Sequence, residues 1–141
     1  MSKEFPIGGG NGWECKKCGM KYDDYMGDDA YFFGHEKEYL KPFRNGERGE
    51  ELKNALAVIP DGEISFYVYS YRCPYCNNLK SERCISTSRP SFNRYVIKKY
   101  DHHICNRCNH EMVEVSSSDR YQGLICPKCG SRMKITSFFQ T

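Results

Sequence analysis

Eight of the nine cysteines stand in four pairs that share the spacing C-x2-C: Cys15, Cys18, Cys73, Cys76, Cys105, Cys108, Cys126 and Cys129. A C-x2-C segment closes in a tight turn and aims two sulfur atoms at one point. Two such turns can supply the tetrahedron of thiolates that structural zinc takes. Eight ligands therefore predict two four-cysteine sites and two Zn²⁺ ions per chain. Disulfides or free thiols are the alternative.

The cellular setting inferred from the sequence favours metal over disulfides. Nine cysteines in 141 residues are fewer than disulfide scaffolds use. The first residues lack the apolar run of a secretory signal, and no segment is apolar enough to cross a membrane. We therefore expect a reducing, cytoplasmic location, in which paired cysteines bind metal more often than they form disulfides.

Composition indicates that metal must contribute much of the stability. Hydrophobic residues make up 39% of the chain, so a large apolar core is not expected. Zinc binding to a four-cysteine site contributes on the order of 10 kcal/mol to folding. Eight thiolates and two divalent cations together add four negative charges. The formal charge of +3 therefore becomes about −1 in the zinc-loaded protein.

Local patterns predict a mainly β chain with one clear helix. Residues 63–71 alternate apolar and polar side chains and lead as a strand into Cys73. Leu52 and Leu56 fall on one side of a helix expected over about residues 47–57, which Pro60 ends. Further strands are expected over residues 92–100, 111–115, 121–125 and 132–139, a loop over 77–91, and a short strand or core anchor over 31–33.

The knuckle sequences resemble those of zinc ribbons and rubredoxins. Residues 13–19 read W-E-C-K-K-C-G, with Tyr22-Asp23 soon after, and residues 126–130 read C-P-K-C-G. Residues 59–61 and 71–76 are similar to the second rubredoxin turn and knuckle, although Asn77 replaces the glycine and 54 residues separate Cys18 from Cys73. Asn77 can adopt the left-handed conformation that glycine supplies. The resemblance implies a small metal-stabilised fold of two zinc-ribbon (rubredoxin-like) units, with iron as an alternative metal at the first site.

Three segments are expected along the chain. Residues 1–12 form a flexible arm with a glycine-rich hinge, residues 13–91 a first zinc-ribbon unit with a long insertion, and residues 92–141 a second unit. Sequential pairing, in which 15/18 joins 73/76 and 105/108 joins 126/129, needs the fewest assumptions. Spacing leaves open a nested arrangement, with 73/76 joined to 105/108, and an interleaved one.

The remaining reactive side chains give weak evidence for an enzyme. Asp101, His102 and His103 next to a knuckle resemble the Asp-His-His core of HNH nucleases, but the spacing is wrong for that site. A four-cysteine site is closed to water and substrate, so its metal is not catalytic. We expect no enzymatic activity. Cys84 is expected to be a buried structural residue, and the histidines, including His110, to be exposed or to support thiolates.

A local excess of positive charge suggests an acidic partner. Residues 72–107 contain two acids and eight basic residues: Arg72, Lys80, Arg83, Arg89, Arg94, Lys98, Lys99 and Arg107. Aromatic residues lie among them, and such surfaces can bind phosphates and stack unpaired bases. We expect a nucleic-acid-binding or transcription- or translation-associated module. A rubredoxin-like electron carrier and a protein-interaction adaptor are the alternatives.

Overall fold

The computed structural model describes residues 9–28, 34–89 and 91–139, and they form two compact units. Of the described residues, the helical unit contains 28, 34–67, 83–89 and 91–102, and the knuckle unit contains 9–27, 68–82 and 103–139. Each unit is thus assembled from separate stretches of the chain, unlike the expected contiguous segments 13–91 and 92–141. The long strands β4 (Ile64–Arg72) and β5 (Leu79–Thr87) contribute to both.

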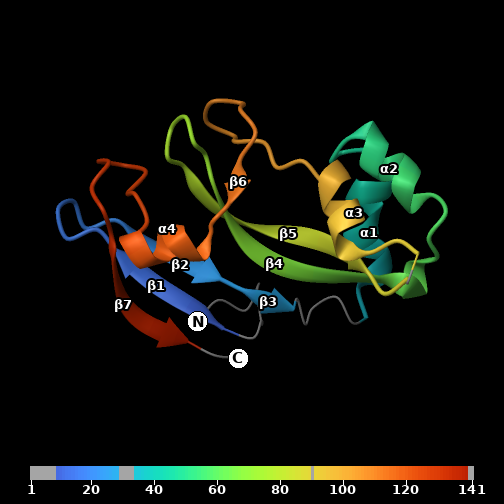
Figure 1. The fold of residues 1–141 in the computed structure, drawn as a ribbon, viewed down its shortest axis with the longest axis horizontal. Coiled ribbons are helices and arrows are strands. Elements are labelled where there is room, and N and C mark those ends of the chain that lie inside the picture. The colour runs from blue at the N-terminus through green and yellow to red at the C-terminus, as the bar shows by residue number, and fades with distance from the viewer. Residues whose placement is uncertain (1–8, 29–33, 90, 140–141) are drawn as a thin grey trace. The chain divides into compact units, whose positions relative to one another are not determined.

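The helical unit is built from α1 (Glu36–Arg44), α2 (Glu50–Leu56) and α3 (Arg94–Tyr100), which cluster near the ends of β4 and β5 (Figure 1). Between α2 and β4 lies the short 3-10 turn η2 (Asp61–Glu63). The core of the helical unit is one cluster of buried residues: Leu40, Phe43, Leu52, Leu56, Ile59, Ile64, Phe66, Ile85 and Ile97. The helix expected over 47–57 is present as α2, and the strand expected over 63–71 is present as β4.

The knuckle unit is built on antiparallel strands. A three-stranded sheet has the order β2-β1-β7, formed by β1 (Gly10–Glu14), β2 (Lys21–Tyr25) and β7 (Lys134–Phe139). The other sheet has the order β3-β4-β5, with β6 (Val113–Glu114) also paired to β4. The short β3 covers Gly27–Asp28, and α4 covers Ser117–Gln122. The chain is therefore mainly β, with four short helices among the described residues.

Two predictions of secondary structure were wrong: the expected strand over residues 92–100 contains a helix, and the expected loop over residues 77–91 contains a strand. Residues 92–100 contain α3, because the Asn93 side chain caps its first turn by accepting from the Val96 N–H at 3.1 Å, and only Ile97 is buried. Residues 77–91 contain β5, whose polar sequence is only half-buried but which pairs along β4 and buries Cys84 and Ile85. A local cap thus begins the helix α3, whereas pairing with β4 makes β5 a strand despite its polar sequence.

The stretch over residues 121–125 was also wrongly predicted as a strand. Residues 117–122 form α4, which a reciprocal capping box of Ser116 and Asp119 begins. The strand expected over 111–115 shortens to β6, and the one over 132–139 is present as β7. A first insertion helix, α1, was not foreseen. Residues 31–33 and most of the expected arm lie outside the described residues, although β1 already begins at Gly10.

Candidate metal centres

The four C-x2-C segments fold into knuckles with the same backbone hydrogen bonds. In the first, the Cys15 N–H donates to the Met20 carbonyl at 2.8 Å, and the Gly19 N–H donates to the Cys15 carbonyl at 2.8 Å. The knuckles that begin at Cys73, Cys105 and Cys126 repeat both bonds at 2.7 to 2.9 Å. Each turn therefore presents its two sulfur atoms in the same way.

A left-handed residue follows the second cysteine of every knuckle. The φ angle is 82° at Gly19 and 80° at Gly130, and it is 64° at Asn77 and 65° at Asn109. Glycine adopts this region without a steric cost, and asparagine is among the few other residues that tolerate it. The inference from the sequence that Asn77 can replace the usual glycine is confirmed.

The knuckles gather in two groups of four cysteines. The outer site contains Cys15, Cys18, Cys126 and Cys129, and the inner site contains Cys73, Cys76, Cys105 and Cys108. Sequential pairing was therefore wrong, and the nested arrangement left open by the spacing is the one present. Strand pairing explains the result. Strand β7 pairs with β1, which brings the last knuckle beside the first, and β6 pairs with β4, which brings the third beside the second.

Sulfur separations within each group are much longer than a disulfide bond and somewhat shorter than those around a bound zinc ion. In the outer site the Cys15 and Cys129 Sγ atoms lie 3.4 Å apart. In the inner site the Cys73 and Cys108 Sγ atoms lie 3.3 Å apart. A disulfide would bring the atoms to about 2.05 Å. A tetrahedral Zn²⁺ with Zn–S bonds of about 2.3 Å separates its sulfur ligands by about 3.8 Å. The donor sets fit one metal ion each.

Hydrogen bonds to sulfur prepare the inner site for a cation. The N–H of Arg107 donates to Cys105 Sγ at 3.4 Å, and Asn78 Nδ2 donates to the same atom at 3.6 Å. Burial opposes ionisation of Cys105, but these donors outweigh it and lower its pKa to about 6. At Cys108 the backbone N–H of His110 favours the thiolate, yet burial and the neighbouring thiols raise its pKa to about 12. Four adjacent thiolates therefore need a cation to balance them.

In the outer site, too, the pKa of one cysteine is lowered and that of another is raised. The backbone N–H of Ser131, supported by its hydroxyl, lowers the pKa of Cys129 to about 6. A backbone hydrogen bond from Met20 favours the Cys18 thiolate, but burial and the other three thiols raise its pKa to about 11. Cys129 is exposed, whereas Cys15 and Cys126 are buried. One edge of this site therefore faces solvent.

A buried ion pair beside the outer site was not foreseen. Asp24 on β2 is fully buried, and its carboxylate accepts from Arg120 Nε at 2.8 Å and Nη2 at 3.0 Å. Trp13 Nε1 also donates to this carboxylate at 3.3 Å. The pair attaches α4 to the β1–β2 hairpin that carries the first knuckle. Asp24 and Arg120 lie 96 residues apart in the sequence, and no sequence pattern indicated that they are in contact.

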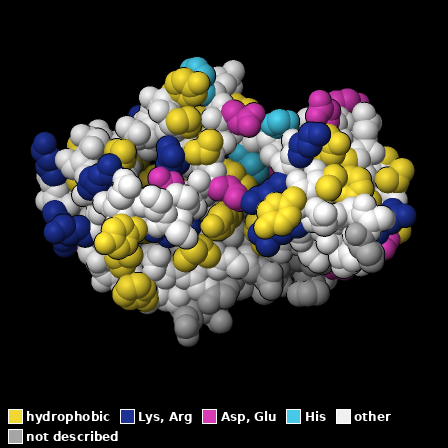
Figure 2. All heavy atoms as spheres, viewed as in Figure 1, with side chains coloured by type: hydrophobic (Ala, Val, Ile, Leu, Met, Phe, Trp, Pro, Cys, Tyr) yellow, Lys and Arg dark blue, Asp and Glu magenta, His cyan; other side chains and the backbone are white. Residues whose placement is uncertain are grey.

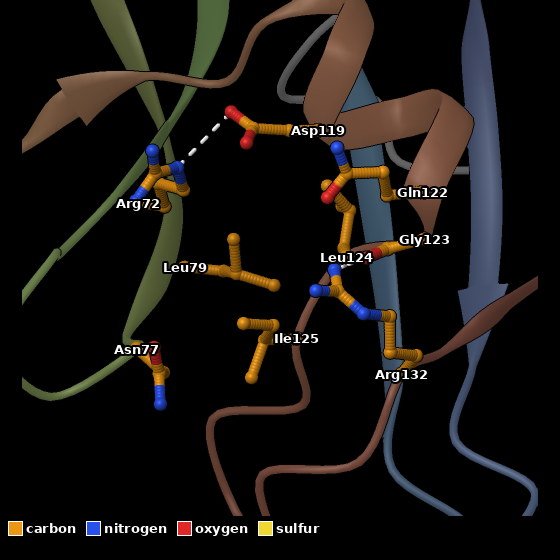
Figure 3. Close-up of a pocket in the computed structure, with 9 residues that line it drawn as sticks. All are labelled: Arg72, Asn77, Leu79, Asp119, Gln122, Gly123, Leu124, Ile125 and Arg132. Carbon is orange, nitrogen blue, oxygen red and sulfur yellow. Dashed lines mark hydrogen bonds and ion pairs between the residues drawn. The ribbon is translucent and has the colours of Figure 1, made fainter.

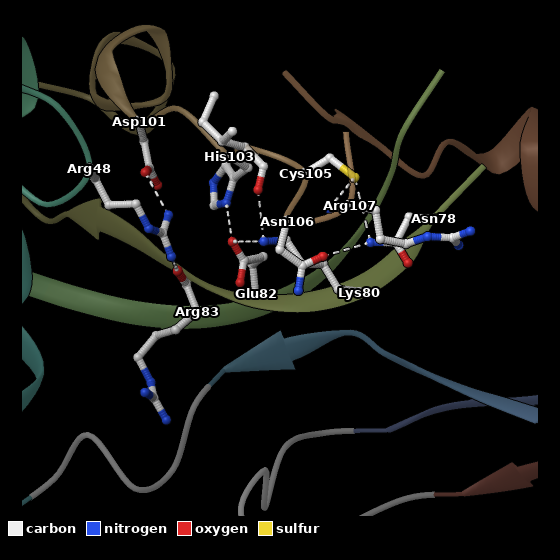
Figure 4. Close-up of polar contacts among 11 residues, drawn as sticks. Arg48, Asn78, Lys80, Glu82, Arg83, Asp101, His103, Cys105, Asn106 and Arg107 are labelled. Carbon is white, nitrogen blue, oxygen red and sulfur yellow. Dashed lines mark hydrogen bonds and ion pairs between the residues drawn. The ribbon is translucent and has the colours of Figure 1, made fainter. Parts of the chain in front are cut away.

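The Asp-His-His segment has structural partners in each unit. In the helical unit, Arg48 Nη1 donates to Asp101 Oδ1 at 2.8 Å (Figure 4). In the knuckle unit, His103 is buried, stacks on Tyr71 with ring centroids 3.9 Å apart, and lies with its Nδ1 3.2 Å from Glu82 Oε1. The absence of enzymatic activity stays a prediction. Cys84 is buried on β5 and belongs to neither four-cysteine group.

The eight basic residues expected to form one face are divided between the units. Arg83, Arg89, Arg94, Lys98 and Lys99 belong to the helical unit, and Arg72, Lys80 and Arg107 belong to the knuckle unit. Many of them make contacts within the chain: Arg94 stacks over the Tyr67 ring at 3.7 Å, and Arg72 pairs with Asp119 at 3.0 Å. Their role in binding stays a prediction.

Two adjoining hollows lie in the knuckle unit near α4. The first, of about 150 Å³, has an apolar floor of Leu79, Leu124 and Ile125, with Arg72 and Arg132 on facing sides (Figure 3). The Arg132 Nη1 donates to the Gly123 carbonyl at 3.0 Å. The second hollow, of about 320 Å³, lies between α4 and β7 and shares residues 122, 123 and 132 with the first.

Comparison with known proteins yields no relative from which a role could be transferred. No protein-family model matches the chain, and no curated protein or solved structure matches it significantly. Among the described residues, no helix combines the length and apolar character needed to span a membrane. The site geometry is therefore the basis on which function has to be argued.

Proposed function

We propose that the chain is a zinc-binding protein with two structural Zn²⁺ ions, which folds as two nested zinc ribbons and acts as a non-catalytic binding module. The observation that carries this proposal is the repetition of one knuckle geometry four times, in two closed groups of four thiols. Sites with four protein ligands leave no position for a reacting water. Structural zinc is consistent with such sites.

The construction of the two sites supports a ribbon description. In each, a β-hairpin carries the first knuckle in its turn, between β1 and β2 or between β4 and β5. An isolated antiparallel bridge closes each second knuckle, Ile104 with Glu111 and Ile125 with Arg132. A strand then follows and pairs with the first strand of the hairpin, as β6 does with β4 and β7 with β1. This repeated construction supports the description of the chain as two zinc ribbons.

Nucleic acid is the partner that we propose for the module. Figure 2 shows basic side chains beside hydrophobic ones on one face, and Tyr121 and Phe138 of the knuckle unit are exposed aromatic residues. Basic and aromatic side chains suit phosphates and unpaired bases. A protein partner in transcription or translation is the alternative. A titration of nucleic acid at two salt concentrations tests the choice, because phosphate contacts make the affinity fall as salt rises.

Metal analysis of protein purified without denaturation tests the metal assignment. We expect two zinc equivalents per chain and no visible absorption. One equivalent or none would refute two structural sites. Iron with visible bands that bleach on reduction would instead support a rubredoxin-like centre, because tetrahedral thiolate sites accept either metal.

A further inference from the structure

The hollow between α4 and β7, called here the β7 hollow, is a surface that the metal sites do not use. Trp13 and Met133 lie along its buried side, and Tyr121, Arg132 and Ile135 are among the residues around it. All of its lining residues belong to the knuckle unit. The hollow is thus formed within the unit that carries both four-cysteine groups.

Tyr121 and Ile135 line the β7 hollow, and Phe138 lies outside its lining, further along β7. Tyr121 is 93% exposed, Phe138 is 79% exposed and Ile135 is 38% exposed. A bulge in the β1–β7 pairing lies between Gly12 and Trp13, so Ile135 lies opposite Trp13 and Phe138 opposite Asn11. Opposed residues of antiparallel strands share a face, as do residues two apart in one strand. Ile135 and Phe138 therefore share a face, and exposed apolar groups gathered in this way mark binding surfaces.

The residues that line the β7 hollow carry positive charge, although Glu14 on β1 lies opposite Lys134. Arg120, Arg132 and Lys134 line the hollow, and none of its described lining residues is acidic. Arg120 is paired with Asp24, whereas Arg132 donates to the Gly123 carbonyl through Nη1 and has no carboxylate partner among the described residues. Arg132 and Lys134 are therefore the cations that an anionic ligand would meet. Figure 2 shows Lys and Arg side chains beside hydrophobic ones over the α4 and β7 region of this face. This charge is complementary to a phosphate backbone.

We propose that the β7 hollow binds single-stranded nucleic acid, with Tyr121 and Phe138 stacking on bases while Arg132 and Lys134 contact phosphates. The inference rests on the proposed nucleic-acid function and names the surface and the strand class. Stacking on exposed rings requires unpaired bases, because base pairs in a duplex already stack on each other. The adjoining hollow shares Arg132, so this guanidinium lies where a strand would pass from one depression to the next.

Fluorescence anisotropy with labelled oligo-dT, oligo-U and a duplex of equal length tests the proposal on the full, zinc-loaded chain. We expect Tyr121→Ala and Phe138→Ala each to weaken single-strand binding by roughly 5- to 150-fold. Lys134→Ala should weaken binding and reduce the salt slope by about 0.7, the value for one phosphate contact on a single strand. Tyr95→Ala is the matched control, because Tyr95 is 80% exposed but belongs to the helical unit.

The possible results distinguish failure of the β7 hollow as the binding site from failure of the nucleic-acid function. Binding that survives in the Tyr121 and Phe138 variants, or falls equally in the Tyr95 control, overturns the β7 hollow as the site but leaves the nucleic-acid function standing. Duplex binding as tight as single-strand binding overturns the strand class. If zinc-loaded protein binds no oligonucleotide even at low salt, both the nucleic-acid function and the β7 hollow as its binding site are refuted. Zinc content and Trp13 fluorescence establish that each variant is folded.

Discussion

Nested pairing predicts how zinc content responds to paired cysteine substitutions. Cys18 and Cys126 belong to the outer site, where their Sγ atoms lie 3.5 Å apart, whereas Cys76 belongs to the inner site. The variant Cys18→Ser with Cys126→Ser should therefore damage one site and keep one intact set of four thiolates. The variant Cys18→Ser with Cys76→Ser should damage both sites and keep none. Sequential pairing predicts the reverse.

The expected magnitude follows from what a metal site contributes. Binding of structural zinc supplies about 10–16 kcal/mol in small zinc domains, which is as large as the whole stability of a typical small protein. Removing one of four thiolates leaves an incomplete tetrahedron around the ion. We therefore expect tightly held zinc to fall from two equivalents to one in the first variant, and to none in the second. The damage to stability should be correspondingly larger in the second variant.

Cobalt substitution provides the assay, because the intensity of the thiolate-to-metal absorption bands reports the number of sulfur ligands. Zinc is counted in parallel by elemental analysis after dialysis against a weak chelator. One intact four-thiolate cobalt site in the Cys18/Cys76 variant, and none in the Cys18/Cys126 variant, would refute nested pairing. Single Cys18→Ser protein is the control that shows whether loss of one site alone releases the other ion.

Three other changes test separate parts of the fold. Arg120→Met should lower the free energy of unfolding, measured with denaturant, by about 3–5 kcal/mol, because it leaves the buried Asp24 carboxylate unpaired. Replacing both residues by apolar ones should lower it less, and equal losses would contradict a buried pair. Burial raises the pKa of Tyr22 to about 12, so stability present below pH 10 should decline by about 2–3 kcal/mol as pH rises through 12, and Tyr22→Phe should remove this decline. The same variant should lose about 1 kcal/mol at pH 7, because the Tyr22 hydroxyl donates to Ser70 at 2.9 Å. Cys84→Ser should retain both zinc equivalents, and loss of one would show that this thiol is a ligand.

Local chemistry made the knuckles predictable from sequence. The C-x2-C spacing and the residue after each pair determine a turn that depends on few other contacts, so all eight cysteines could be identified. Even the unusual Asn77 followed from backbone physics. Strand β4 was equally clear, because Ile64, Phe66 and Val68 alternate with more polar residues, although Tyr67 and Tyr71 are buried as well.

Long-range pairing could not be obtained from the same patterns. The choice between nested and sequential sites depends on which strand lies beside β1, and β7 lies more than 100 residues away in sequence. The buried Asp24–Arg120 pair has the same origin. A helix signal at Asn93 and a capping box at Ser116 were present locally, but the β-branched and aromatic residues around them resembled strands.

Nesting also has a consequence for how the knuckle unit folds. The core beside the outer site combines Trp13 and Met133, which flank that site, with Leu79 and Val115, which come from the segment enclosing the inner site. Residues from the segments around both sites therefore bury one another's apolar surface. A shortened chain that joins residue 27 to residue 116 keeps every ligand of the outer site but loses Leu79 and Val115. Since burial of such side chains contributes about 1.5–3 kcal/mol each, the outer site depends on the segment that carries the inner site for more than connection.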